Sequence, residues 1–249
     1  MSTFRYSVAR HASVGALLLL VVVSPIFGSP PAEALIGDVH IFGPATRMEV
    51  GATMEIFESG TTQERELEAW FERNEGAFSL FVEVTRPPFL RNMKFLLLRE
   101  GSREESWMRT SRGVRRIGSS NGEERVFGSH FSARDFSRID PGDARISYAE
   151  EPTGNQATID VRDSTGAGGH RRFYIDIERR LIEGITFYDR NGDLVKEYEL
   201  LEVEEVEGNP VPRRARMAMS DGSGSTTVTI GSVSFPRSIP RRYFSRGNL

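Results

Sequence analysis

The stretch WMRTSRGVRRIGSSNGEERVFGSHFSARDF, residues 107–136, contains the kinds of element that recur along the chain. It starts with bulky apolar residues, passes through an arginine cluster and reaches Asn121-Gly122. This dipeptide predicts a tight hairpin because both residues accept positive φ, and we expect residues 123–127 to form the returning strand. Ser132 and Asp135 fit a capping box, which predicts a short helix at this point.

Outward from this stretch, short alternating runs of apolar and polar residues predict further strands. They cover residues 48–57, 65–73, 78–84, 93–98, 105–110, 144–150, 157–162, 172–178, 182–188, 194–207, 213–220 and 226–235. Residues 93–98 are apolar on both faces, so we expect that strand to be covered on both sides. These short strands, separated by turn signals about every ten residues, predict a mainly β domain, an antiparallel sheet or barrel.

The N-terminus has the pattern of a secretory signal peptide. Arg5 and Arg10 make it basic, residues 16–23 form an apolar run, and Ala32-Glu33-Ala34 offers small residues for cleavage. The run is shorter than the ~20 residues that a membrane-spanning helix needs. We therefore predict that residues 1–34 are removed and that residues 35–249 form one domain. The remainder is expected to be a soluble protein of the bacterial periplasm, and no cysteine follows the cleavage site to carry a lipid.

Composition narrows the function classes. The chain has 249 residues, no cysteine and a net charge of −3, so its fold must be stable without disulfides. The mild acidity gives no reason to expect nucleic-acid binding.

The polar residues of the quoted stretch do not form a recognisable catalytic motif. Ser129, His130 and Asp135 suggest a hydrolytic triad, but no G-x-S-x-G pattern surrounds a serine, and triads are defined by geometry. We expect Ser129 and Ser132 to bond backbone groups instead. The chain is therefore predicted not to be an enzyme, and a hydrolase that uses His130 or His170 is the competing hypothesis.

Two glycine-containing loops resemble ligand loops only weakly. Residues 189–193 (DRNGD) have some features of a calcium loop, but Gly192 is at position 4 and Leu200 at position 12. A type I′ hairpin explains Asn191-Gly192 better. Residues 166–169 (GAGG) lack the G-K-[ST] of a phosphate loop and favour a hairpin. No metal or cofactor is expected.

The arginine cluster at residues 109–116 admits two interpretations. Arg109, Arg115 and Arg116 are candidates for contact with anionic headgroups or an acidic partner surface. Alternatively, the cluster is a solvated strand face balanced by neighbouring glutamates.

Several motifs together resemble a known family. Residues 127–136 (FGSHFSARDF) resemble the family's segment Phe-x-Gly-Ser-Asp-Phe-Ser-Tyr-Glu-Asp-Leu, and residues 84–88 (VTRPP) its strand that ends in proline. Residues 187–192 (FYDRNG), followed by Lys196, resemble its Tyr-Asp-x-x-Gly hairpin with a trailing lysine. The chain in this respect resembles the outer membrane lipoprotein-sorting proteins, relatives of the lipoprotein carrier LolA. The family's N-terminal helix is not evident between Leu35 and Met48.

The resemblance implies a curved, incompletely closed antiparallel β-barrel with a few short helices over an apolar cavity. It implies a periplasmic carrier that binds acyl chains of a lipid or lipoprotein and moves it towards the outer membrane, with an RND-type transporter as a partner. The predicted lipid-binding residues are Phe78, Leu80, Val82, Val84, Phe95, Leu97, Trp107, Ile117, Phe131, Phe136, Phe173, Ile175, Ile185 and Phe187.

The same apolar residues also fit a packed core. In that case the chain is a non-carrier interaction protein that docks a membrane transporter through its sheet. A filled interior would favour this alternative.

Overall fold

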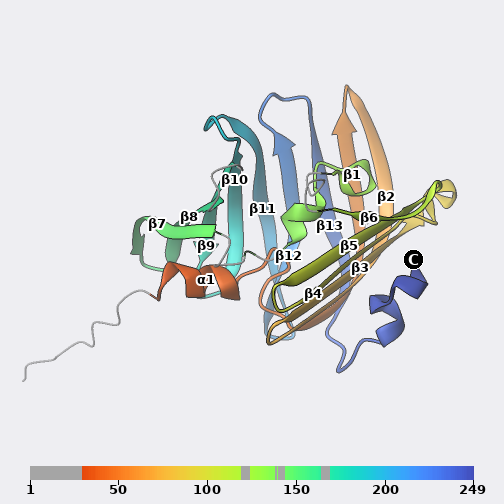
Figure 1. Ribbon diagram of the computed structural model, residues 1–249, viewed down its shortest axis with the longest axis horizontal. Helices are drawn as coiled ribbons and strands as arrows, with labels where there is room; N and C mark the ends of the chain where they lie inside the picture. Colours follow the sequence, from red (N-terminus) through yellow and green to blue (C-terminus); the bar gives the residue numbers. More distant parts are fainter. Residues whose placement is uncertain (1–29, 119–123, 138, 140–143, 164–168) are drawn as a thin grey trace, which may run out of the picture.

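One antiparallel sheet of 13 strands organises the described part of the chain (Figure 1). The computed structural model describes residues 30–118, 124–137, 139, 144–163 and 169–249. The strand order is β6-β5-β4-β3-β2-β1-β13-β12-β11-β10-β9-β8-β7. The sheet is strongly curved and is not closed, because β6 and β7 are its two edges and pair with different neighbours. The predicted incompletely closed antiparallel barrel with few short helices is confirmed.

The strands extend over most of the described chain. They are β1 (Arg47–Glu58), β2 (Thr61–Asn74), β3 (Ala77–Arg86), β4 (Lys94–Glu100), β5 (Arg103–Thr110), β6 (Gly113–Ile117), β7 (Ala144–Thr153), β8 (Gln156–Asp163), β9 (His170–Asp176), β10 (Leu181–Tyr188), β11 (Leu194–Val206), β12 (Asn209–Met219) and β13 (Gly224–Ser234). Twelve of these overlap the predicted strands, since half-buried antiparallel strands keep the period of two.

The path of the chain explains why one side of the sheet is covered. Strands β1 to β6 proceed to one edge of the sheet, and β7 to β13 return from the other edge until β13 pairs with β1. The connection between β6 and β7 must therefore cross from edge to edge. Its described central part, residues 125–137, lies over the concave face, and we call it the cover segment (Figure 1).

The cover segment contains two 3₁₀ helices, η3 (Val126–Gly128) and η4 (Ala133–Phe136). One half of the predicted capping box at the start of η4 is confirmed, with the Ser132 N–H donating to Asp135 Oδ2 at 2.7 Å, whereas Ser132 Oγ has no hydrogen-bond partner among the described residues. The predicted returning strand at 123–127 is wrong in its described part, where η3 begins at Val126. Strand β5 instead pairs with β6 across an earlier turn at Ser111-Arg112, and Asn121-Gly122 lies outside the described residues.

A helix that the sequence analysis missed, α1 (Ala32–Asp38), packs on the concave face beside β7. It has only seven residues and no side-chain cap, so its local signal is weak. Its buried Leu35 and Ile36 join the apolar cluster of strands β8 to β12. Cleavage after Ala34, as predicted, would divide this helix. No helix in the described ranges is long and apolar enough to cross a membrane.

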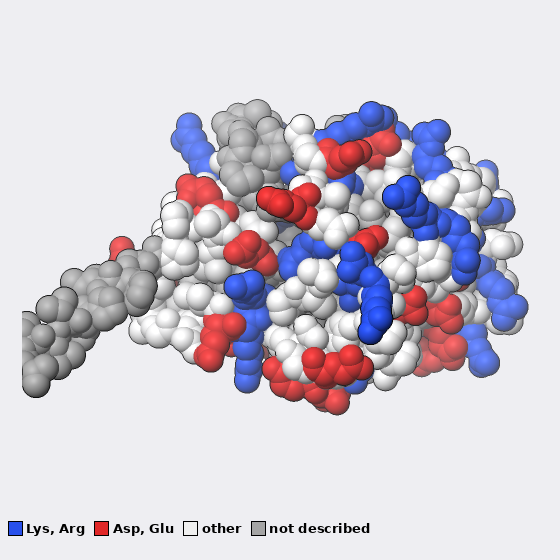
Figure 2. All heavy atoms as spheres, turned by 90° about the horizontal axis from the view of Figure 1, so that it is seen from below, with Lys and Arg blue, Asp and Glu red and all other residues white. Residues whose placement is uncertain are grey.

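The convex face of strands β2 to β5 is covered by the C-terminal segment, which includes η5 (Arg241–Phe244) and η6 (Arg246–Asn248). Tyr243 stacks on Trp70 with ring centroids 4.0 Å apart, and Arg246 lies 5.4 Å from the Trp107 ring centroid. Lysine and arginine side chains are frequent on the underside of this end of the molecule (Figure 2). Strand β4 is thus covered on both sides, as predicted: Leu96 contacts the C-terminal segment's cluster and Phe95 faces the concave side.

Candidate functional site: an apolar cavity under the cover segment

An apolar cavity of about 110 Å³ lies between the concave face of the sheet and the cover segment. Strands β1 and β2 supply much of its wall through alternate residues, as the period of two requires. These are Met48, Val50, Ala52 and Met54 of β1 and Leu67, Ala69 and Phe71 of β2. The far wall is formed by Tyr198 of β11, Pro212 and Ala215 of β12, and Val228 and Ile230 of β13. Burial raises the pKa of Tyr198, so its phenol stays neutral here.

The cover segment contributes its own apolar side chains to the cavity. Val126, Phe127, Phe131 and Phe136 all line it, and Phe131 stacks on Phe136 with centroids 5.9 Å apart. Phe127 has φ +54°, a left-handed conformation that costs a bulky residue about 1 kcal/mol or more. Its side chain is only 1% exposed, so burial of the ring against the cavity offsets that cost.

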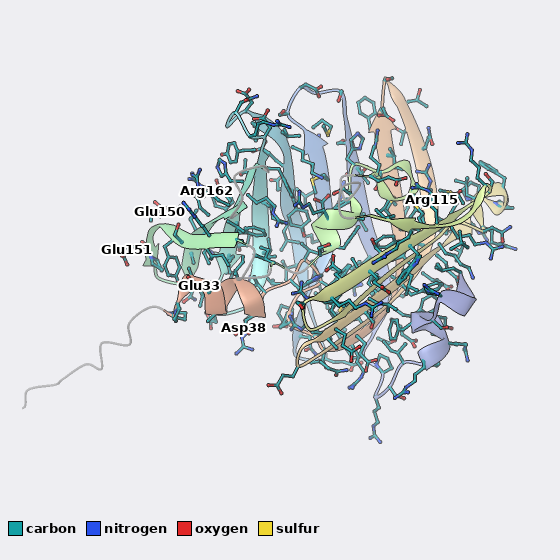
Figure 3. The ribbon with its side chains drawn as sticks, viewed as in Figure 1. Glu33, Asp38, Arg115, Glu150, Glu151 and Arg162 are labelled. Atoms are coloured by element: carbon teal, nitrogen blue, oxygen red, sulfur yellow. The ribbon has the colours of Figure 1, made fainter. Side chains whose placement is uncertain are left out.

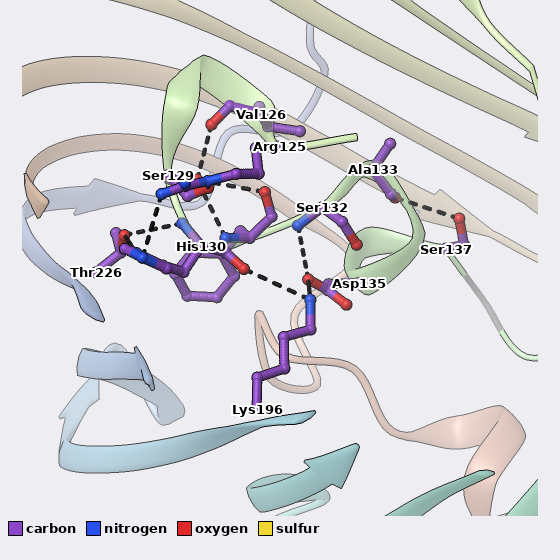
Figure 4. Close-up of polar contacts among 11 residues, drawn as sticks. Arg125, Val126, Ser129, His130, Ser132, Ala133, Asp135, Ser137, Lys196 and Thr226 are labelled. Carbon is purple, nitrogen blue, oxygen red and sulfur yellow. Dashed lines mark hydrogen bonds and ion pairs between the residues drawn. The ribbon is translucent and has the colours of Figure 1, made fainter. Parts of the chain in front are cut away.

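A buried ion pair fastens η4 to the sheet. Lys196 of β11 donates to Asp135 Oδ2 at 2.6 Å, and the two side chains are 8% and 4% exposed (Figure 4). Lys196 also lies 4.8 Å from the centroid of the Phe187 ring. The two segments that resembled the sorting proteins, 127–136 and 187–196, are therefore joined by this contact.

A second polar attachment fastens the other end of the cover segment. His130 Nδ1 and its backbone N–H lie 2.8 and 2.9 Å from Thr226 Oγ1 on β13, and Arg125 Nη2 lies 3.2 Å from His130 Nε2 (Figure 4). Burial, followed by the charge of Arg125, lowers the pKa of His130. The neutral imidazole therefore accepts from Arg125 through Nε2, which leaves Nδ1–H to donate to Thr226. Arg125 in turn donates to Glu58 of β1 at 2.6 Å and lowers its pKa.

These contacts show no assembled hydrolytic triad. Ser129 donates to the Val126 carbonyl at 2.7 Å, His130 bonds Thr226 and Arg125, and Asp135 bonds Lys196. Ser129 satisfies backbone groups, as expected, but the same expectation is wrong for Ser132, whose hydroxyl is buried without a hydrogen-bond partner among the described residues. Among the described residues, no group of three His, Asp or Glu side chains is arranged to hold a metal ion.

The two glycine-containing loops, residues 189–193 and 166–169, were both predicted to be hairpins rather than ligand loops. A hairpin at residues 189–193 is confirmed, but the predicted type I′ turn is wrong. The Gly192 N–H donates to the Asp189 carbonyl at 3.1 Å, so Arg190 and Asn191 are the central residues, and Gly192 has positive φ whereas Asn191 does not. The Asp189 carboxylate accepts from the N–H groups of Asp193 and Asn191, which lowers its pKa. The loop at residues 166–169 lies mostly outside the described residues.

The structure distributes the predicted lipid-binding residues over several clusters. Leu80, Val82, Phe95, Phe131 and Phe136 line the cavity. Phe78, Val84, Leu97 and Ile117 belong to the apolar cluster around it. Phe173, Ile175, Ile185 and Phe187 belong to the cluster of the other wing of the sheet, which α1 covers.

Trp107 does not fit the prediction, because it lies on the convex face with Leu96, Phe81 and Trp70. Strand β5 directs Met108 towards the concave cluster, so its neighbour Trp107 must point the other way. The alternation of that strand alone could not show which face encloses the cavity.

The predicted headgroup arginines lie at the edge of the sheet, away from the cavity lining. Arg115, in the middle of the edge strand β6 (Figure 3), pairs with Glu124, and Arg116 lies 3.5 Å from Glu105. Arg109 is half-buried on β5, opposite Val114. Two of the three are thus balanced by glutamates.

The prediction omitted the cavity residues of β1, although their alternation is visible in the sequence. Met48, Val50, Ala52 and Met54 alternate along β1, and this alternation placed the strand but was not used to assign its inner face.

Solved structures place this architecture within a known class of fold. The chain is similar to a DUF1329 family protein from Desulfovibrio piger, with a TM-score of 0.75 and 15% identity over 89% of this chain and 100% of that chain. It is similar to an outer membrane lipoprotein-sorting protein domain from Vibrio parahaemolyticus, with a TM-score of 0.72 and 16% identity over 81% and 90% of the two chains. A LolA superfamily protein from Nitrosomonas europaea has a TM-score of 0.66 and 15% identity over 89% and 100%. The chain therefore has a LolA-like fold.

Among the curated proteins, none matches the sequence. A family model with the description "-like: Uncharacterized protein" matches residues 78–249, so the chain belongs to that family.

Proposed function

We propose that the protein is a carrier that binds the acyl chains of a lipid or lipoprotein in the apolar cavity under its cover segment. The observation that carries the proposal is the cavity itself, whose described lining is apolar apart from the Ser129 and Tyr198 hydroxyl groups. A filled interior would have favoured the interaction protein without a ligand. The proposed role is binding and transfer, without a catalytic step.

The energetics of acyl chains make such a carrier necessary. At about 0.8 kcal/mol per buried CH₂, moving a sixteen-carbon chain through water without cover costs roughly 10 kcal/mol or more. An apolar cavity offsets that cost only if the chain fits into it. The present cavity of about 110 Å³ is smaller than the roughly 300 Å³ of a small ligand pocket, so loading requires an outward movement of the cover segment.

The attachments of the cover segment suit such a movement. They are few and polar, namely the Lys196–Asp135 pair and the bonds of His130 to Thr226 and Arg125. Apolar contacts with the cavity, by contrast, can be exchanged for contacts with an acyl chain of similar chemistry. The cover segment can thus open without an unfavourable change of environment for its phenylalanines.

We place this activity in the periplasm, after removal of the predicted signal peptide, with transfer towards the outer membrane. The signal-peptide pattern and the fold shared with lipoprotein-sorting and LolA superfamily proteins support this location. An RND-type transporter as a partner stays a prediction.

A cavity-filling variant tests the proposal. Ala215 lines the cavity on β12, whereas Ala218, on the same strand, points to the opposite face. We expect Ala215→Phe to lower the affinity for a fluorescent fatty-acid probe by about tenfold, and Ala218→Phe to leave the affinity for the probe unchanged. Lipid extraction and mass spectrometry of the purified wild-type protein accompany the titration. Absence of both bound lipid and probe binding in the wild type would refute the carrier function.

A further inference from the structure

An arginine occupies a position on the concave face where the alternation of β2 calls for an apolar residue. Arg65 precedes Leu67, Ala69 and Phe71 at intervals of two, and those three residues line the cavity. It pairs across the sheet with Met54, which also lines the cavity. Arg65 is only 8% exposed. Its side chain therefore extends the cavity's inner face at one end.

The guanidinium group of Arg65 is incompletely paired. Its Nη2 donates to Gln63 Oε1 at 3.2 Å. Its Nε and Nη1 are buried and have no hydrogen-bond partner among the described residues, and the charged group that acts on Arg65 there is Arg125 rather than a carboxylate. The neighbouring charge is the guanidinium of Arg125, which repels that of Arg65. The carboxylate of Glu58 is already bonded to Arg125.

A buried cation without a counter-ion is strongly unfavourable in a folded protein. Such groups are retained when a ligand supplies the missing charge, and active or binding sites are where they gather. The planar fork of arginine fits two oxygens of a phosphate or carboxylate, and the resulting charge-assisted hydrogen bonds are stronger than neutral ones.

The surroundings place this fork beside the cover segment. A Cβ at Gly128 would lie 3.8 Å from Arg65 Nη2, so the η3 turn passes directly over the guanidinium. Val126 and Phe127 of the same turn line the cavity. Movement of this turn would therefore open the cavity and the arginine together.

We propose that Arg65 binds the anionic head group, a phosphate or a carboxylate, of the lipid whose acyl chain occupies the cavity. This inference rests on the proposed carrier function. The chain lies along the face of Leu67, Ala69 and Phe71, and its charged end meets Nε and Nη1 of Arg65. The cargo is thus an anionic amphiphile held in one orientation.

Three ligands with the same twelve-carbon chain test the proposal: dodecyl phosphate, laurate and dodecanol. Each displaces the neutral fluorescent probe N-phenyl-1-naphthylamine from the purified protein. We expect at least one anionic ligand to bind about tenfold or more tightly than dodecanol, and the tighter of the two identifies phosphate or carboxylate as the preferred group. Arg65→Met should reduce the preference to within about twofold and leave dodecanol affinity unchanged. Arg216→Met, an exposed arginine on β12, is the matched control and should keep the preference.

The outcomes separate this inference from the carrier function. If no ligand and no probe binds the wild type, the carrier function fails. If dodecanol binds as tightly as both anions, the cavity is a carrier site and the role of Arg65 is refuted. A purely structural role predicts that Arg65→Met lowers the melting temperature and leaves the anion preference intact. The proposed role predicts an equal or higher melting temperature, because an unpaired buried charge is removed.

Discussion

The Lys196–Asp135 pair offers a quantitative test of how the cover segment is held. The Nζ–Oδ2 distance is 2.6 Å, and both side chains are more than 90% buried. Asp135→Leu would leave the Lys196 ammonium beside the Phe187 ring and the His130 carbonyl without its counter-ion, and Lys196→Met would leave the buried Asp135 carboxylate without its cation. Removal of one partner from a buried pair costs about 3–5 kcal/mol. For a domain of this size we therefore expect each single variant to lower the melting temperature by about 6–20 °C.

The double variant Asp135→Leu/Lys196→Met separates the pair from its surroundings. Replacement of both charges by apolar groups is often neutral or stabilising, so the double variant should be about as stable as the wild type. Urea denaturation of the four proteins gives the coupling energy, which the two single-variant costs place at about 6–10 kcal/mol. A coupling energy below about 0.5 kcal/mol, with both single variants near wild-type stability, would show that the pair does not hold the cover segment.

Two further predictions address the convex face and the second attachment. Trp107→Ala should cost about 3–5 kcal/mol of unfolding free energy and leave the affinity of the fatty-acid probe unchanged, because the ring packs under the C-terminal segment; a loss of affinity in folded protein would place Trp107 at the cavity after all. Because burial and Arg125 lower the pKa of His130 in the folded state, protonation is favoured in the unfolded state, whose pKa is about 6.5. The contribution of His130 to stability should thus be complete above pH ~6.5 and should decline as the pH falls through that value towards the lower folded pKa. In urea titrations at pH 7.5 and 5, the unfolding free energy of His130→Gln should therefore decline less than that of the wild type. An identical decline in both proteins would contradict the assignment.

The strands could be predicted from the sequence because each leaves one face on an apolar interior. Runs such as Phe78, Leu80 and Val82 alternate strictly, and β4 revealed its double coverage by a run without alternation. Strand β6 was not predicted because four of its five residues are exposed, so it has no apolar alternation. The turn was then placed at Asn121-Gly122, since a strong local signal outweighed the weaker Ser111-Arg112.

The faces of the sheet could not be assigned in the same way. In β5, Trp107 and Met108 are neighbours, so the alternation shows an apolar residue on each face of the strand. Trp107 lies on the convex face because the C-terminal segment, from a distant part of the sequence, packs against it. Arg65 was overlooked for a related reason. Within an alternating charged run it resembled a solvated residue, and its burial depends on the cover segment from elsewhere in the chain.

The position of a bound acyl chain is the most direct test of the central claim. A sixteen-carbon fatty acid with a photoactivatable diazirine near its end can be crosslinked to the purified protein and the adducts mapped by mass spectrometry. We predict adducts on cavity-facing residues such as Met54, Leu80 and Val82, and fewer of them in Ala215→Phe. Adducts confined to the convex face around Trp70 and Trp107, or an equal yield in Ala215→Phe, would contradict the claim that the concave cavity holds the chain.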